Sequence, residues 1–158
     1  MPDYGILPAD EGTGLINWSW AEEQMRASRN FWVATRWPDG RPHVVPVWAV
    51  WDGDALWFSG GLHSRKVRNV VADPRCSLST EDAANPVVVE GVASEIDDVE
   101  AKQSFLDLTN AKYDTSYELS FLDPATTAVL RVMPTWAFAM REHDFSGSPT
   151  RWQFDSLD

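Results

Sequence analysis

Residues 31–59 read FWVATRWPDGRPHVVPVWAVWDGDALWFS, and this stretch decides the fold that we expect. Three runs rich in β-branched and aromatic residues, 31–37, 43–51 and 55–59, are separated by Pro-Asp-Gly and Asp-Gly-Asp. Such runs, broken by turn-forming residues, are typical of strands joined by tight connections. The stretch therefore predicts an antiparallel meander.

The sequence downstream continues the same pattern. Further strands are expected at 76–80 and 87–96, and a last pair at 127–133 and 136–140 is split by Pro134. Six or seven short strands without regular strand–helix–strand alternation favour an antiparallel barrel that is closed or nearly closed. The predicted fold class is mainly β with short helices.

Three helices are expected around these strands. Ser19 has the Ser-x-x-Glu spacing of a capping box and opens a helix that ends near Ser28. Ser64 is the expected N-cap of a helix that runs to residue 72. The Asp-x-x-Glu sequence at 97–100 precedes a third helix, which runs to about residue 110.

Bulk properties limit the organisation and the partners. A chain of 158 residues that is 44% apolar suits one domain, which we place at 17–158 behind an irregular arm at 1–16. Its net charge of −11 argues against nucleic acid and anionic membranes as partners, and no apolar run is long enough to span a bilayer. A lone Cys76 and an N-terminus without a secretory leader pattern predict a cytoplasmic protein.

The segment at 59–69, SGGLHSRKVRN, is the sharpest local feature for chemistry. It predicts a strand end, a flexible loop and a helix N-terminus, where free N–H groups attract an anion. Arg65 and Lys66 would oppose the helix dipole in this first turn unless an anion lies there. The segment predicts a phosphate site, although a solvated surface helix, with Asn69 as a surface amide, fits the spacing equally well.

The run at 43–51 is apolar on both faces, so we expect it to be covered once by the core and once by a ligand or a partner subunit. Pro46 deletes one backbone donor from this strand, which indicates an edge, a bulge or a ligand. A planar ring or a plain sheet edge would each explain that proline.

Side chains typical of acid–base, nucleophilic or metal catalysis are not arranged in recognisable patterns. His43, His63 and His143 lack metal-ligand spacing, and Cys76 has no nearby histidine in the sequence. We therefore predict no metal, assign no catalytic side chain, and expect a bound cofactor to supply the chemistry. Most of the nine tryptophans should be core or interface residues.

The Ser64-Arg65-Lys66 sequence, followed by Asn69 and Asp73-Pro74-Arg75, resembles the pyridoxamine-phosphate-oxidase-like flavin and deazaflavin oxidoreductases. The resemblance runs from about residue 20 to residue 140, and it implies a split β-barrel that forms a homodimer with cofactor sites at the interface. It assigns the cofactor phosphate to Ser59, Ser64, Arg65, Lys66 and Asn69. It assigns the ring-binding strand to Val44, Val45, Pro46, Val47 and Trp48, and Trp136 to the partner subunit's site.

Departures from the vitamin-B6 oxidases narrow the expectation. Those enzymes resemble this chain but have an Arg and a Lys where it has His43 and Trp48. The chain is more similar to the deazaflavin-dependent branch, so we expect an F420-dependent reductase that passes hydride to an unsaturated small molecule. An FMN enzyme of the same fold and a non-catalytic flavin- or deazaflavin-binding protein are the alternatives. The acidic tail of F420 could run past Arg65, Lys66, Arg68 and Arg75.

Overall fold

A computed structural model describes residues 5–8 and 10–154, so the beginning of the expected arm, at 1–4, lies outside the described residues. The helices are α1 (Trp18–Ala27), α2 (Arg65–Ala72) and α3 (Val99–Tyr113), with 3-10 turns η1 (Leu119–Leu122) and η2 (Glu142–Asp144). The strands are β1 (Phe31–Arg36), β2 (Pro42–Val47), β3 (Val50–Trp51), β4 (Leu56–Gly61), β5 (Arg75–Thr80), β6 (Val87–Glu95), β7 (Thr127–Ala139) and β8 (Thr150–Gln153).

All eight strands belong to one antiparallel sheet, whose order is β2-β1-β5-β6-β7-β4-β3, with β8 paired to β7. The predicted mainly β, antiparallel fold is confirmed. The two ends of this order, β2 and β3, are joined by only Trp48 and Ala49. Because two residues span so short a distance, the sheet must curl until its edges meet, which makes an incompletely closed barrel. We call Trp48–Ala49 the seam.

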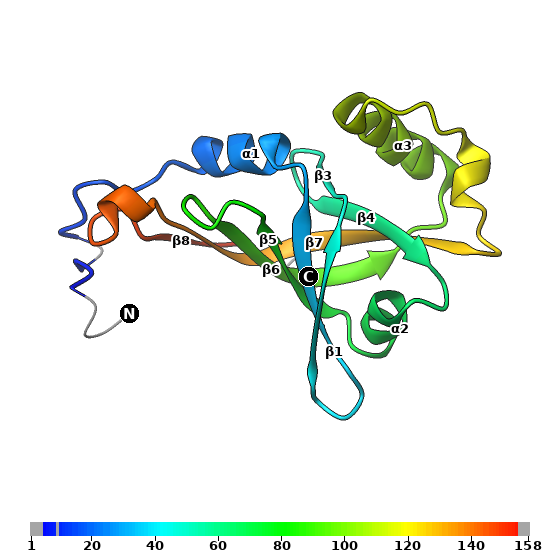
Figure 1. Cartoon of the computed structure of the whole chain (residues 1–158), viewed down its shortest axis with the longest axis horizontal. Coiled ribbons are helices and arrows are strands. Elements are labelled where there is room, and N and C mark those ends of the chain that lie inside the picture. The colour runs from blue at the N-terminus through cyan, green and yellow to red at the C-terminus, as the bar shows by residue number, and fades with distance from the viewer. Residues whose placement is uncertain (1–4, 9, 155–158) are drawn as a thin grey trace.

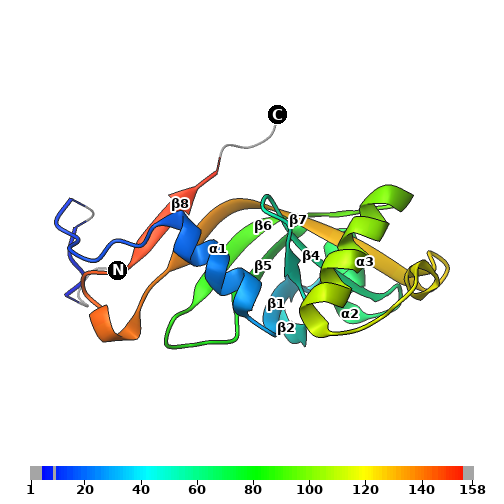
Figure 2. The same ribbon diagram turned by 90° about the horizontal axis from the view of Figure 1, so that it is seen from above.

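The helices lie around this curled sheet. In Figure 1, α1 and α3 lie above the strands and α2 lies below β4. Figure 2 shows α1 and α3 at different positions along the sheet, so each covers its own part of it. Helix α1 contacts β3, α2 contacts β1 and β4, and α3 contacts β3.

Two hydrophobic clusters hold the sheet in this shape. The larger fills the inside of the barrel and includes the fully buried Phe31, Leu78 and Leu130. The smaller lies under α3, where Leu106 packs with Trp57. Each large apolar side chain removed from water in this way stabilises the fold by about 1.5–3 kcal/mol before entropy is counted.

The expected single strand at 43–51 is wrong, because the chain leaves one sheet edge at Val47 and joins the other edge at Val50. The seam residue Ala49 therefore has no strand neighbour for its backbone groups. The Tyr113 hydroxyl accepts a hydrogen bond from Ala49 N at 2.9 Å and donates one to Ala49 O at 3.0 Å. Lys112 Nζ donates a second hydrogen bond to Ala49 O at 2.8 Å. Side chains of α3 thus provide the hydrogen bonds that the backbone of Ala49 does not receive from a neighbouring strand.

The expected break at Pro134 is also wrong, since β7 runs without interruption from Thr127 to Ala139. The pairing with β6 shifts register between Glu90 and Gly91, and Pro134 lies opposite Gly91 at this bulge. A Cβ at Gly91 would lie 2.3 Å from the Met133 carbonyl oxygen, so only glycine fits there. Pro134 has no backbone N–H to donate to β6. The strand tolerates this because the hydrogen-bond ladder is interrupted at the bulge.

Some helix boundaries differ from the expectation. Helix α1 begins one residue before Ser19, with Asn17 as its N-cap, so the expected capping box is not used. Helix α3 is capped by Asp98, whose side chain accepts from Ala101 N, and it runs three residues past Asn110 to Tyr113. Strand β8 was not expected. Among the described residues, no helix is long and apolar enough to cross a bilayer.

Candidate functional site

The end of β4 leads directly into the N-terminus of α2, as residues 59–69 predicted. Ser64 is the N-cap, as expected, but its side chain makes no capping hydrogen bond. Its Oγ is buried and finds no hydrogen-bond partner anywhere in residues 5–8 and 10–154. A buried hydroxyl without a partner costs about 1–3 kcal/mol, so its position indicates a missing partner from outside the chain.

Lys66 folds back over β4 toward the same place. An added Cβ on Gly60 would lie 2.8 Å from Lys66 Cε and 3.0 Å from Lys66 Nζ, so the glycine makes room for the lysine. Burial lowers the pKa of Lys66 below its usual value, because the charged form loses hydration. An anion beside the Lys66 ammonium would stabilise its charged form and so offset the cost of the lost hydration.

Arg65 projects from the same turn. Its guanidinium carbon lies 3.7 Å from the centroid of the Trp37 ring, which belongs to the tip of the β1–β2 hairpin. Stacking on an aromatic face holds an arginine in place while leaving its N–H groups free to bind an anion. Trp37 is therefore part of the candidate site, although its sequence position gave no reason to choose it.

Of the four cations proposed for an acidic cofactor tail, Arg75 is already paired. Arg75 Nε and a terminal nitrogen donate to the Asp73 carboxylate at 2.9 and 2.8 Å, and Arg36 donates to it at 2.6 Å. The hydrogen bonds from Arg75, with a contribution from Arg36, hold the pKa of Asp73 far below its usual range. Arg75 is therefore committed to Asp73, whereas Arg68 is exposed in α2.

Asn69 is fully buried, so the interpretation as a surface amide is wrong. Its Nδ2 lies 3.0 Å from Thr35 Oγ1, and the Thr35 hydroxyl is also 3.4 Å from His43 Nδ1. The other end of the amide is buried without a partner among the described residues. The Thr35 hydroxyl can donate as well as accept, so it could equally bond to the amide oxygen of Asn69. The amide can then rotate by half a turn and offer its NH₂ group to an anion.

The predicted ring strand is β2, which lies at one end of the strand order and pairs only with β1 along that path. Val44 and Pro46 are exposed, Val45 is half-buried and Val47 belongs to the core. Pro46 thus occupies a sheet edge, where a missing N–H disrupts no second ladder. One apolar face of this strand, with Val44 and Pro46, is therefore left exposed by the described residues.

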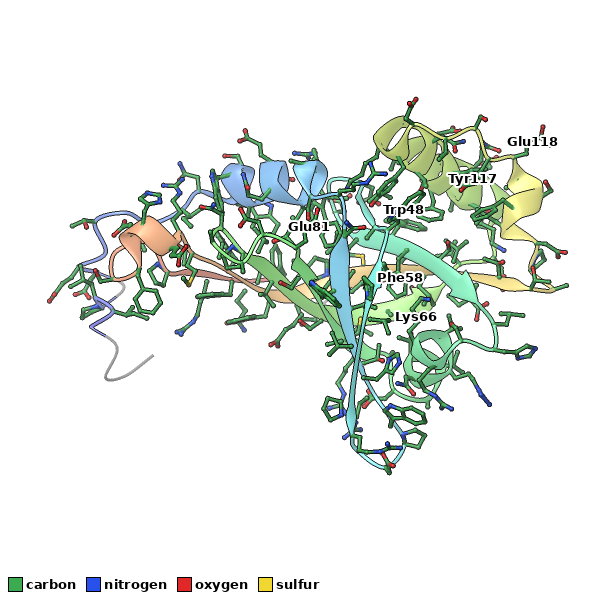
Figure 3. All side chains as sticks on the ribbon, in the orientation of Figure 1. Trp48, Phe58, Lys66, Glu81, Tyr117 and Glu118 are labelled. Carbon is green, nitrogen blue, oxygen red and sulfur yellow. The ribbon has the colours of Figure 1, made fainter. Side chains whose placement is uncertain are left out.

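Trp48 lies at the seam and stacks on Tyr113, with ring centroids 4.2 Å apart and planes inclined by 6°. The Arg29 guanidinium carbon is 5.9 Å from both centroids, so it lies beside the stacked pair and covers neither outer face. Trp48 is 40% exposed, and its free face borders a pocket. In Figure 3, Trp48 and Tyr117 lie beneath α3, while Lys66 lies farther down beside α2.

This pocket has a volume of about 160 Å³ and lies between β4, α3 and η1. Phe105, Leu106 and Thr109 of α3 form its buried floor, and exposed Trp48, Tyr117 and Phe121 form its rim together with half-buried Ser59. Sequence reasoning chose only Trp48 and Ser59 from this set. The others lie on α3, on η1 and in the loop between them, and no local pattern distinguishes them from ordinary core or surface residues.

Trp136 lies far from these residues within one protomer. Ser59 pairs with Val129 of β7, and Trp136 is seven residues farther along that strand, which is about 23 Å. Its ring is half-buried and stacks near Phe138, with centroids 6.3 Å apart. The fold thus brings Ser59, Ser64, Lys66 and Asn69 into one region with β2 nearby, but it does not bring Trp136 there.

Comparison with known proteins places the fold and the family. The chain is similar to a solved F420 reductase, at 28% identity over 73% of this chain and 94% of that one, with a TM-score of 0.61. It is also similar to a conserved hypothetical protein of Mycobacterium tuberculosis, at 25% identity over 90% and 95% of the two chains, with a TM-score of 0.71. ChuZ of Campylobacter jejuni shares the fold at 12% identity and a TM-score of 0.72, over 87% of this chain and 61% of that one.

The sequence matches none of the curated proteins with which it was compared. The family model described as pyridoxamine 5'-phosphate oxidase matches residues 21–141, which include most of α1, the whole barrel sheet except β8, and both ends of the candidate site. The expected resemblance is therefore confirmed, and the chain belongs to the pyridoxamine 5'-phosphate oxidase family.

Proposed function

We propose that this protein is an F420-dependent oxidoreductase that reduces an unsaturated small molecule. The observation that carries the proposal is a pair of buried polar atoms that have no partner among the described residues, Ser64 Oγ and Asn69 Oδ1, together with the half-buried Lys66 ammonium in the first turn of α2. A phosphorylated flavin or deazaflavin fits these groups, because the hydroxyl and the ammonium can donate to phosphate and the amide can rotate to donate as well. Similarity to an F420 reductase at 28% identity supports the deazaflavin.

The residues at the α2 N-terminus would bind the phosphate. Lys66 would supply a charge at the place that Gly60 leaves open, and the Ser64 hydroxyl would donate to a phosphate oxygen. Arg65, supported by the Trp37 ring, would close the site from the side of the β1–β2 hairpin. Free N–H groups and the dipole of α2 favour an anion there.

The β2 edge and the seam would position the ring. When bound, such a cofactor supplies a hydride, which together with a proton reduces a polarised double bond by two electrons. The chain's own contribution would be orientation, because neither end of the site contains a recognisable acid–base pair. The exposed apolar face of β2, with Val44 and Pro46, would lie against the ring or the partner subunit.

A homodimer is part of the same proposal. Trp136 is too far from Ser59 to serve the site of its own protomer, and β1 presents Trp32 with 49% of its surface exposed. Isolated monomers seldom expose large aromatic side chains on a sheet next to further apolar residues unless that face has a partner. A second copy would cover this face and bring its Trp136 to the site.

FMN is the second candidate, and the position of Arg29 favours it. The reduced ring of FMN becomes anionic at its pyrimidine side, and the neutral Trp48 side chain offers no charge to stabilise it. The Arg29 guanidinium carbon, however, lies 5.9 Å from the Trp48 centroid and can supply that positive charge from the end of α1. The choice between the two cofactors thus depends on measured affinity.

The test is a titration of the apo-protein with F420 and with FMN at matched ionic strength. We expect F420 to bind more tightly, and turnover with reduced F420 to distinguish an enzyme from a storage or carrier protein. FMN affinity at least tenfold greater, a difference of about 1.4 kcal/mol, would contradict the F420 assignment and favour the FMN enzyme.

A further inference from the structure

The pocket between β4, α3 and η1 adjoins the proposed cofactor site without coinciding with it. Trp48 and Ser59 belong to both, because Trp48 lies at the seam and Ser59 lies near the end of β4. The remaining lining residues come from α3, η1 and the loop between them, and none of them belongs to α2. A molecule in this pocket would therefore lie beside the cofactor, next to the ring at Trp48.

The shape of the pocket selects for a flat ring. Four of its lining side chains are aromatic, and two of these, Tyr117 and Phe121, are stacked with centroids 4.2 Å apart and planes 10° from parallel. Trp48 also lines the pocket and is held in place by its own stack on Tyr113. Rings that are already fixed lose little entropy on binding, so a planar guest can stack on them at low cost.

The size limits the guest to about one ring. A volume of about 160 Å³ is close to that of an engineered protein cavity of about 150 Å³ that binds benzene. It is well below the roughly 300–1,000 Å³ of pockets that enclose drug-sized ligands. Phe105 is 5% exposed and Thr109 is 7% exposed, so this floor belongs to the packed interior and deepens only if α3 moves.

The side chains that line the pocket favour an uncharged ligand. No lining residue in the part of the chain that the structure describes is charged, and the polar side-chain groups are the hydroxyls of Ser59, Thr109 and Tyr117 and the indole N–H of Trp48. Thr109 Oγ1 donates to Phe105 O at 2.8 Å, which leaves its lone pairs as acceptors. An ion would lose its hydration here without gaining a counter-charge, whereas a neutral polar substituent can bond to a hydroxyl.

We propose that this pocket binds the hydride acceptor and that the acceptor is an uncharged molecule built on a single planar, unsaturated ring with a small polar substituent. The role of this ligand as a hydride acceptor rests on the proposed function, whereas the preference for a neutral planar ring is a property of the pocket alone. The proposed function and the binding preference can therefore fail separately.

The binding test uses the apo-protein and two probes of equal ring size, p-cresol and benzoate, with dissociation constants measured by ligand-observed NMR. We expect p-cresol to bind at least tenfold more tightly than benzoate, because a carboxylate is desolvated without compensation. Contacts from the p-cresol methyl group to the methyl groups of Leu106 and Thr109 should appear in nuclear Overhauser spectra. Equal affinity for the two probes, or contacts elsewhere, would overturn the proposal.

The variant test compares Phe121→Ala with Leu119→Ala. Both residues lie on η1, at 47% and 36% exposure, but only Phe121 lines the pocket. We expect Phe121→Ala to weaken p-cresol binding about tenfold, through loss of its ring and of the stack with Tyr117, and Leu119→Ala to leave it unchanged. Equal effects of the two substitutions would contradict the assignment, and thermal melting checks that both variants fold.

A final arm separates acceptor from cofactor. The p-cresol titration is repeated on protein saturated with F420, whose own binding is measured first. Unchanged or tighter p-cresol binding supports an acceptor pocket beside the cofactor, whereas competitive displacement would assign the pocket to the cofactor and overturn the proposal. If neither F420 nor FMN binds, the proposed function fails, and the probe titrations on the apo-protein still decide whether the ring pocket exists.

Discussion

The N-terminus of α2 carries two cations, Arg65 and Lys66, and a buried serine hydroxyl that has no partner within the described residues. At the seam, by contrast, Tyr113 and Lys112 of α3 satisfy both backbone groups of Ala49, and Trp48 is stacked. The first region has a polar group without a partner in the chain, whereas in the second the backbone groups of Ala49 are satisfied within the chain. Substitutions at the α2 end should therefore change ligand affinity, and substitutions at the seam should change stability.

Lys66→Ala should give the largest effect on affinity. Loss of a charge-assisted contact to phosphate weakens cofactor binding by about 1.5–3 kcal/mol, or roughly ten- to a hundred-fold. Isothermal titration of the apo-protein with cofactor measures this change. Arg26→Ala is the matched control, since Arg26 is an exposed cation on α1, outside the residues assigned to the cofactor. Equal losses of cofactor affinity in the two variants would mean that only the overall charge of the protein matters, and would contradict a phosphate site at the α2 N-terminus.

Tyr113→Phe should give the largest effect on stability. It removes the hydroxyl that serves both Ala49 N and Ala49 O, and the buried N–H would be left without an acceptor. We expect a loss of about 1–3 kcal/mol in the free energy of unfolding, measured by urea denaturation. Tyr117→Phe removes an exposed hydroxyl nearby and serves as the control. An unchanged midpoint for Tyr113→Phe would show that the seam does not depend on α3.

Lys112 predicts a pH dependence that belongs to the seam. Burial lowers its pKa to about 8, although the charge of Glu81 acts in the opposite direction. Between pH 8 and 10 the folded state loses this proton while the unfolded state keeps it, so stability rises with pH. We expect a gain of about 1 kcal/mol, because partial exposure weakens the effect.

The measurement compares unfolding of the wild type and Lys112→Met across that window. It stops at pH 10 because burial raises the pKa of Tyr113 to about 12, which gives the opposite slope at higher pH. Parallel profiles for the two proteins would contradict the assignment of the rise to Lys112.

Ser64→Ala should give the smallest change in stability and the clearest contrast with Tyr113→Phe. Because Ser64 Oγ is buried without a partner, its removal should leave the apo-protein equally stable or up to about 1 kcal/mol more stable. Cofactor binding should nevertheless weaken several-fold, since a phosphate contact is lost. A variant that is destabilised without cofactor would show that Ser64 supports the helix and not a ligand.

The two regions also differ in how far the sequence predicts them. Ser64, Arg65 and Lys66 were predicted as a phosphate site because capping, the helix dipole and glycine all act within a few residues. The expected strands at 31–37, 55–59 and 76–80 agree with β1, β4 and β5 to within two residues, since alternation and turn signals are equally local. These parts needed no knowledge of where distant segments lie.

The seam and the pocket depend on contacts that no local pattern encodes. The break at Trp48–Ala49 exists because the sheet curls, and Lys112 and Tyr113 lie more than 60 residues away from the backbone groups that they satisfy. Trp37 meets Arg65, and Tyr117 meets the pocket, only because the hairpin and the loop between α3 and η1 fold back onto the barrel. The sequence by itself determined the antiparallel strands and the cationic helix start, since hydrogen bonding and charge act over a few residues. Closure of the barrel alone decided which aromatic side chains share a pocket, because close packing joins residues by position in space and not by position in the chain.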